Sequence, residues 1–304
     1  MEHDIFFSIS QTPDADGHIP NELTMLRNYF QQLKCADDLG FGVGWIAQAH
    51  LSTETQKSNS KPVVPHWQGE VGLCTDFPQL AMESFRRTKN IEIGSAVVSI
   101  LASGGPIAQA ERIANTLQLL AVSDDHRRLH VGFSAGRFEF RARPYGIVPR
   151  TPVEEAAWPA LRGQIFLEAS EIFLRLLRGD VVSSDSVRPT ILTRENFRSD
   201  EDWQRVQEAN GSLDDAINVE RRYTLRTSAS FQTPSIEISW FSLREHTIRR
   251  LKFLSTPSYR YVCLIFQSRN PRLSKQRMNE CGLVSTPMVV HGSGRTCPEP
   301  VSCS

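Results

Sequence analysis

A histidine occupies a point in the sequence where its imidazole could do acid–base chemistry. His50 closely follows the apolar run Phe41–Ala47, which is rich in residues that favour β-strands. A neutral imidazole at the end of a strand can hydrogen-bond to a bound molecule or transfer a proton near pH 7. His50 is therefore the candidate catalytic residue. The competing interpretation is a histidine in a surface loop, and spacing alone does not separate the two.

A second segment combines glycines with an arginine in a way that suits an anionic ligand. Gly132, Ser134 and Gly136 lie in and just after the apolar run Leu129–Phe133, and Arg137 comes next. Glycine lets the backbone approach a ligand closely, and a guanidinium can hold a phosphate through paired hydrogen bonds. This segment is a candidate phosphate-binding loop, and a solvated arginine after a turn is an equal alternative.

Metal chemistry is not indicated by the spacing of potential ligands. The six cysteines include no CxxC pair or other metal-type spacing. His126 and His130 are four residues apart, but His130 lies in a strand-like run, so the two rings do not share the face of a helix. We predict no metal site.

These candidates are positioned by alternating strand-like and helix-like segments. Apolar runs predict strands at Asp4–Ile9, Phe41–Ala47, Ile91–Ile100 and Leu129–Phe133. Helical spacing predicts helices at Leu26–Leu39, after an N-cap at Asp76, at Ile107–Leu120 and at Leu161–Arg178. This alternation calls for a parallel sheet in an α/β fold. A barrel and an open doubly wound sheet both remain open, although no GxGxxG follows the first strand.

Composition excludes several classes of protein. The 304 residues carry a net charge of 0 at a pI near 7.1, so no basic field attracts nucleic acid. No apolar stretch approaches the roughly 18 residues of a membrane helix. The start Met1–Asp4 has none of the features of an export signal, so we expect a cytoplasmic protein without membrane contact.

Five pieces of the sequence, in order, resemble the bacterial luciferase-like family of flavin-dependent monooxygenases. They are Ala36–His50, Ile93–Val98, Gly105–Arg112, Arg128–Arg137 and Phe166–Ile172. The resemblance covers roughly residues 1–180 and rests on the order of the pieces rather than on any one of them. It implies a (β/α)8 TIM-type barrel. Only about six strands can be counted, so a barrel that is incomplete at its C-terminal end is also compatible with the sequence.

The resemblance also implies a cofactor and a partner. A reduced FMN, supplied by a flavin reductase, would be used with O2 to oxidise a small organic substrate that the sequence does not identify. Members typically carry an acidic residue and two histidines at the end of the second strand. Here Gln48 and Ala49 replace the first two and only His50 remains, which argues against light-emitting aldehyde oxidation.

The resemblance assigns cofactor contacts to particular residues. Small side chains at Ser95, Ala96 and Val97 would lie beneath the flavin ring, where a flat ligand needs close approach. The loop around Arg137 would approach the phosphate, although the family's basic residue often stands one position earlier than Gly136, where this chain has Ala135. The full predicted set is Ser95, Ala96, Val97, Gly132, Ser134, Gly136, Arg137 and Ser268, the last within a segment that faintly resembles the family's phosphate loop.

Two other functions stay open. One is a deazaflavin-dependent enzyme of the same superfamily that transfers hydride. The other is a flavin-binding protein without turnover. A homodimer is also compatible with the resemblance.

The last part of the chain differs from the rest in composition. Residues 240–304 contain 10 Lys and Arg against 3 Asp and Glu, and four of the six cysteines. We predict one barrel domain over residues 1–304, with a polar insertion at about 183–233 and an atypical segment at 240–304 that is less ordered than residues 1–180. Tyr261–Phe266 is the exception, because its apolar run could dock beside the fourth strand and cover that edge.

Overall fold

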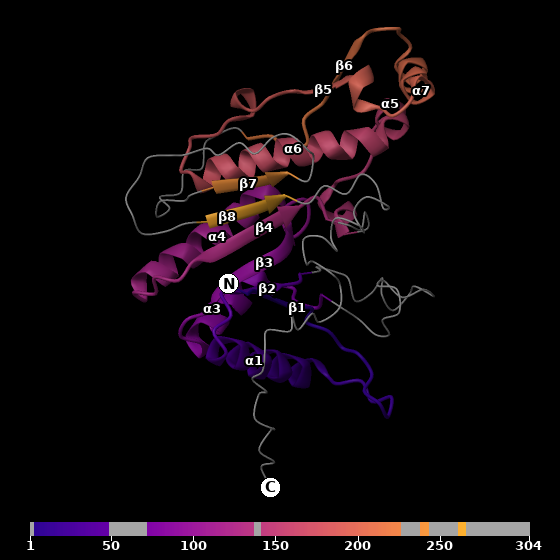
Figure 1. The fold of residues 1–304 in the computed structure, drawn as a ribbon. Coiled ribbons are helices and arrows are strands. Elements are labelled where there is room, and N and C mark those ends of the chain that lie inside the picture. Colours follow the sequence, from indigo (N-terminus) through magenta and orange to yellow (C-terminus); the bar gives the residue numbers. More distant parts are fainter. Residues whose placement is uncertain (1–2, 49–71, 137–140, 226–237, 243–260, 266–304) are drawn as a thin grey trace. The chain divides into compact units, whose positions relative to one another are not determined.

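The computed structural model describes residues 3–48, 72–136 and 141–225, together with the backbone of residues 238–242 and 261–265. Its six-stranded sheet has the order β1-β2-β3-β4-β8-β7 (Figure 1). The strands are β1 (Ile5–Phe7), β2 (Val43–Ile46), β3 (Glu92–Ser99), β4 (Leu129–Ser134), β7 (Ile238–Ser242) and β8 (Tyr261–Ile265).

The strand order bears on whether the parallel sheet is of the barrel type or doubly wound, which periodicity left open. The pairs β1–β2, β2–β3, β4–β8 and β7–β8 are parallel. Strands β1 to β4 stand in chain order, as consecutive strands do in a (β/α)8 barrel, whereas a doubly wound sheet reverses its order near the first strand. The predicted α/β class is confirmed. The predicted docking of Tyr261–Phe266 is also confirmed, because Phe133 of β4 pairs with Ile265 of β8.

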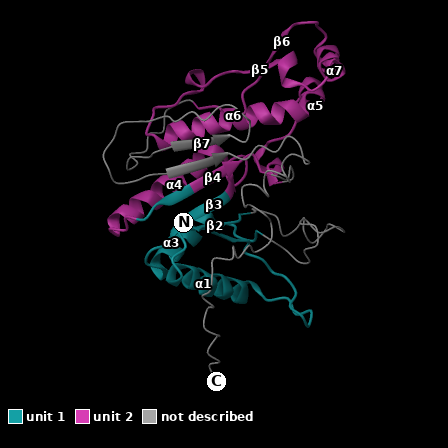
Figure 2. Ribbon diagram, viewed as in Figure 1, with its two compact units in different colours: residues 1–96, 127–130, 268–304 teal, residues 97–126, 131–267 magenta. Residues whose placement is uncertain are grey.

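The chain divides into two compact units (Figure 2). The first comprises residues 1–96, 127–130 and 268–304, and the second comprises residues 97–126 and 131–267. Strands β3 and β4 each contribute to both. Each unit is described here by itself.

In the first unit, two helices cover the parallel strands β1 and β2. Helix α1 (Glu22–Asp38) begins at Asn21, whose side chain accepts a hydrogen bond from the Thr24 N–H at 2.9 Å. Helix α3 (Phe77–Arg87) begins at Asp76, which accepts from the Gln79 N–H at 3.1 Å. The predicted cap at Asp76 is therefore confirmed.

A buried carboxylate fixes the start of β3. Asp37 accepts backbone hydrogen bonds from Lys89, Asn90 and Ile91 at 2.7, 2.8 and 2.7 Å. Burial raises the pKa of Asp37, but these three donors outweigh it and hold the pKa below its usual value. The end of α1 is thereby tied to the turn that precedes β3.

In the second unit, helices α4 (Gly105–Val122) and α6 (Trp158–Leu177) pack against each other (Figure 1). Phe133 of β4 meets Phe166 and Phe173 of α6 at ring-centroid distances of 6.1 and 5.1 Å. The apolar face predicted for the long helix is buried, as its periodicity indicated. The core thus lies between β4 and α6.

The region predicted as a polar insertion contains regular structure. Strands β5 (Thr190–Thr193) and β6 (Ala216–Val219) form an antiparallel pair. Helix α7 (Asp200–Asn210) begins at the capping Ser199 and ends at Gly211, whose φ is +69°. This region also contains the short helices η3 (Ser184–Ser186) and η4 (Arg194–Asn196), whereas the short elements η2 (Arg143–Tyr145) and α5 (Pro152–Ala156) precede α6.

The order predicted for residues 240–304 falls largely outside the described residues and stays a prediction. The single-domain boundary at 1–304 also stays a prediction.

Candidate functional site

The chain bends directly after β4, beside Ser99 at the carboxyl end of β3. In the second unit, the Gly136 N–H donates to Ser134 Oγ at 3.1 Å, and Ser99 Oγ donates to the Ala135 carbonyl at 3.3 Å. Gly136 has a φ of +84°, and a Cβ there would lie 2.8 Å from Ser99 Oγ. A Cβ at this point would require Ser99 to move, so glycine suits both the positive φ and the packing against Ser99.

The loop after β3 also contains residues with positive φ. Ser103, Gly104 and Gly105 have φ values of 55°, 92° and 79°, and α4 begins there without a side-chain cap. Gln109 Nε2 holds the loop by donating to the Ser103 carbonyl at 3.3 Å. A Cβ on Gly105 would come within 3.4 Å of the Tyr223 ring, so residues far apart in sequence meet at this end of β3.

In the second unit, the structure describes four of the predicted cofactor-binding residues, namely Val97, Gly132, Ser134 and Gly136. Val97 is partly exposed on β3, whereas Gly132 and Ser134 are buried on β4. Ser134 takes part in the bend at Gly136 described above. The structure therefore brings Ser134 and Gly136 together, next to Ser99, which the sequence analysis did not select.

Two further predicted residues belong to the first unit. Ser95 is fully buried on β3, and Ala96 beside it is partly exposed. Gly94 precedes them, and a Cβ on it would lie 2.5 Å from the Trp45 ring. The small residue at Gly94 is thus explained by packing within the first unit.

Three predicted residues lie outside the described residues. They are His50, Arg137 and Ser268. Their assigned roles as catalytic imidazole and phosphate contacts stay predictions.

Gln48, which stands where the family has an acidic residue, has a structural contact. Its Nε2 donates to the Thr75 carbonyl at 3.2 Å, and its backbone forms isolated bridges with Leu73 and Cys74. Gln48 Oε1 is buried and has no hydrogen-bond partner in the described part of the chain. The amide therefore fastens the segment that leads into α3.

His130 forms an ion-pair-like contact rather than a metal site. Its Nε2 lies 2.6 Å from Glu92 Oε2, and Arg128 Nε lies 2.7 Å from Glu92 Oε1. Burial raises the pKa of Glu92, but these two partners lower it more. Among the residues that the structure describes, no group of three or more His, Cys, Asp and Glu could hold a metal.

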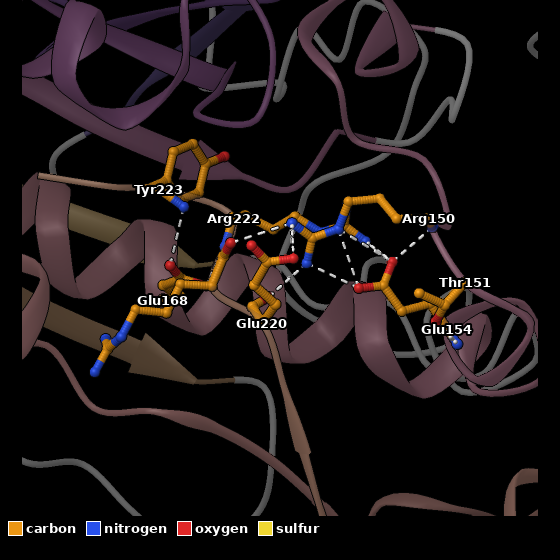
Figure 3. Close-up of polar contacts among 8 residues, drawn as sticks. Arg150, Thr151, Glu154, Glu168, Glu220, Arg222 and Tyr223 are labelled. Atoms are coloured by element: carbon orange, nitrogen blue, oxygen red, sulfur yellow. Dashed lines mark hydrogen bonds and ion pairs between the residues drawn. The ribbon is translucent and has the colours of Figure 1, made fainter. Parts of the chain in front are cut away.

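An ionic cluster joins α5 and α6 to the segment after β6 (Figure 3). Arg150 Nη2 and Arg222 Nη2 converge on the carboxylate of Glu154 at 2.8 and 2.6 Å. The Arg222 and Glu154 side chains are only 3% and 5% exposed. Glu168 of α6 accepts from the backbone N–H of Arg222 and of Tyr223 at 3.4 and 3.2 Å. These contacts tie residues 222–223 to the helices.

The ionisation of the two glutamates differs for physical reasons. Burial raises the pKa of Glu154, but the hydrogen bonds from Arg150 and the charge of Arg222 lower it more. For Glu168, burial dominates over the backbone donors, so its pKa is raised. Burial likewise raises the pKa of the Tyr223 phenol, whose hydroxyl has no partner among the described residues.

Sequence reasoning missed a buried arginine close after β4. Arg141 is 5% exposed, and its Nε and Nη2 have no hydrogen-bond partner within the described ranges. Burial lowers its pKa to about 10, so it still carries its charge at neutral pH. The sequence shows three arginines in this stretch, Arg137, Arg141 and Arg143, and nothing in their order tells which one is buried.

Comparison with known proteins gives structural neighbours only. No protein-family model matches the chain, and no curated protein matches it. Among solved structures it is similar to the monooxygenase RslO1 from Streptomyces bottropensis, with 18% identity and a TM-score of 0.41 over 60% of this chain and 45% of that one.

Two further neighbours have comparable similarity. The oxygenating constituent of 3,6-diketocamphane monooxygenase from Pseudomonas putida, in complex with FMN, has 14% identity and a TM-score of 0.42 over 66% of this chain and 47% of that one. An F420-dependent secondary alcohol dehydrogenase has 14% identity and a TM-score of 0.38 over 79% of this chain and 52% of that one. The chain spans about half the length of these proteins. Within its described part, no helix is long and apolar enough to cross a membrane.

Proposed function

We propose that this chain is an oxidoreductase that binds a flavin or deazaflavin at the carboxyl ends of β3 and β4. The observation that carries the proposal is the bend at Ser134–Gly136, where a Cβ on Gly136 would require Ser99 to move. In parallel α/β folds, ligands bind at the carboxyl ends of the strands. A flat cofactor needs a backbone that it can approach closely, and the small residues at this bend are the proposed surface.

The described residues of the second unit fit such a group. In the proposed site, Val97 and Gly132 would contribute small residues beside the ring, and Ser134 and Gly136 would contribute polar backbone groups at the strand end. When bound, the cofactor supplies the redox chemistry, while the protein orients it and keeps water away. His50 is proposed to hold or move a proton near the reacting atoms.

The finer form of the proposal is a monooxygenase. It would use reduced FMN from a separate flavin reductase, together with O2, on a small organic substrate. This form rests on the five sequence pieces, including the small residues Ser95 and Ala96 on β3. The deazaflavin-dependent enzyme and the binding protein without turnover are the rival forms, and the assay below distinguishes them.

The test is an anaerobic titration of the purified chain with FMN, reduced FMN and a deazaflavin. Saturable binding of reduced FMN, followed by O2 consumption above that of the reductase alone when NADH is supplied, is the expected result. Binding of the deazaflavin alone supports hydride transfer, and flavin binding without extra O2 consumption supports the non-catalytic form. If none of the three compounds binds at high micromolar concentration, the proposal is wrong.

A further inference from the structure

Arg141 is a buried cation without a counter-charge. Its residue is 5% exposed, and no carboxylate lies within ion-pair distance of it in the described part of the chain. Removing a guanidinium from water is costly, and folded proteins normally pair a buried charge. Because its pKa of about 10 keeps Arg141 charged at neutral pH, the fold retains a cation whose donors are unused.

The unused donors have a geometry that suits one kind of ligand. Nε and Nη2 of a guanidinium point their N–H bonds to the same edge, and both are without a partner on Arg141. That edge matches two oxygens of a carboxylate or phosphate. Arg222 differs, because its unpartnered nitrogens are Nε and Nη1, which lie on either side of the Nη2 that binds Glu154.

Arg141 is held on a fixed turn rather than on a free loop. It directly precedes the carbonyl of Ala142, which accepts from the Tyr145 and Ile147 N–H groups at 3.0 and 3.3 Å. Ala142 and Ile147 are buried, which anchors both ends of the turn. Along the chain, Arg141 stands five residues after Gly136, on the connection that leaves the carboxyl end of β4.

We propose that Arg141 anchors an oxyanion site that receives a phosphate or carboxylate group of a bound molecule. The group could belong to the cofactor, as the FMN phosphate, or to the substrate, and the recognition chemistry is the same. The cofactor version rests on the proposed function. In that version, Arg141 makes a phosphate contact of the kind that the sequence analysis predicts for Arg137.

The test measures the binding of FMN, riboflavin and inorganic phosphate to the full chain by calorimetry. Variants are Arg141→Gln, Arg141→Lys and the control Arg143→Gln, which removes the same charge from an exposed neighbour. If the anion is the cofactor phosphate, Arg141→Gln should weaken FMN about ten- to a hundredfold and leave riboflavin within about threefold. Arg141→Lys should lose part of that affinity, and Arg143→Gln should bind like the unchanged chain.

The phosphate arm separates this proposal from the flavin proposal. Inorganic phosphate should bind saturably to the unchanged chain, above chloride at equal ionic strength, and Arg141→Gln should abolish that binding. Phosphate binding with equal affinity for FMN and riboflavin assigns the anion to the substrate, and phosphate binding without any flavin binding refutes only the flavin proposal.

Two results overturn the oxyanion site. One is a chain that neither binds phosphate above the chloride control nor prefers FMN to riboflavin. The other is an Arg141→Gln variant that binds phosphate and FMN like the unchanged chain. Should Arg141→Gln fail to fold, as judged by circular dichroism, the binding data for the unchanged chain and for Arg141→Lys decide the matter.

Discussion

Two buried arginines of the second unit differ in how their charge is balanced. Arg222 lies 2.6 Å from Glu154 Oε2, within a cluster that also includes Arg150. Arg141 has no such partner among the described residues, although both arginines are almost completely removed from water. The two regions therefore differ in whether the guanidinium has a carboxylate partner among the described residues.

The difference indicates two uses of the same side chain. The cluster around Glu154 connects segments of the chain, since Arg150 also donates to the backbone carbonyls of Glu220 and Arg221 at 2.6 and 3.3 Å. The region after β4 holds a buried guanidinium whose Nε and Nη2 have no partner among the described residues, and this is the region of the proposed oxyanion site. The first region should therefore respond to mutation mainly in stability, and the second mainly in binding.

The largest expected effect comes from removing the carboxylate that pairs with Arg222, which would leave Arg222 unpaired like Arg141. Glu154→Gln removes the counter-charge and leaves a buried guanidinium unbalanced, so the free energy of unfolding should fall by about 3–5 kcal/mol. Urea denaturation followed by circular dichroism measures it. Glu155→Gln is the matched control, because Glu155 is exposed and adjacent, and it should change stability by less than about 0.5 kcal/mol.

A loss below about 1 kcal/mol in Glu154→Gln would remove the contrast between the two arginines. In that case this fold tolerates an unpaired buried guanidinium, and the burial of Arg141 does not require a ligand.

The next effect tests the bend at the end of β4. Gly136→Ala places a side chain at a φ of +84° and pushes its Cβ against Ser99 Oγ, so we expect a loss of about 2–3 kcal/mol together with weaker FMN binding. Gly146→Ala is the control, since its φ is +77° with nothing within 4 Å, and it should lose only the strain of about 1–2 kcal/mol.

A double variant separates contact from strain. Ser99→Ala combined with Gly136→Ala removes the Oγ and should recover part of the lost stability, while the positive φ remains. If Gly136→Ala costs no more than Gly146→Ala, the contact with Ser99 does not constrain the bend.

The smallest effect concerns the pH dependence of Glu168. Its pKa is raised in the folded chain, so its favourable contribution is fully present below the unfolded pKa of about 4.3 and is lost as the pH rises through the folded pKa. Glu168→Gln keeps an acceptor for the N–H groups of Arg222 and Tyr223 but no longer titrates. The decline in unfolding free energy from about pH 4.3 toward neutrality should be shallower in the variant. Identical slopes would show that Glu168 titrates normally.

The sequence by itself determined the elements and their alternation. Apolar spacing located β1 to β4 and the long helix α6, and cap residues such as Asp76 marked where helices begin, because these signals act within a few residues. It also identified the docking strand at Tyr261. In the region after Gly179, helix α7 is marked by a capping serine, Ser199, and a terminating glycine, Gly211. Apolar periodicity alone does not indicate this helix.

Only the tertiary structure decided which polar residues are buried and what they meet. Glu154 and Arg222 are 68 positions apart, and no local sequence pattern in either segment indicates their contact. Likewise Arg137, Arg141 and Arg143 are equivalent in sequence, yet Arg141 is buried and Arg143 is exposed. The free energy of a charged side chain depends on the solvent and partners that remain after distant segments have packed around it, and a local pattern carries no information about either.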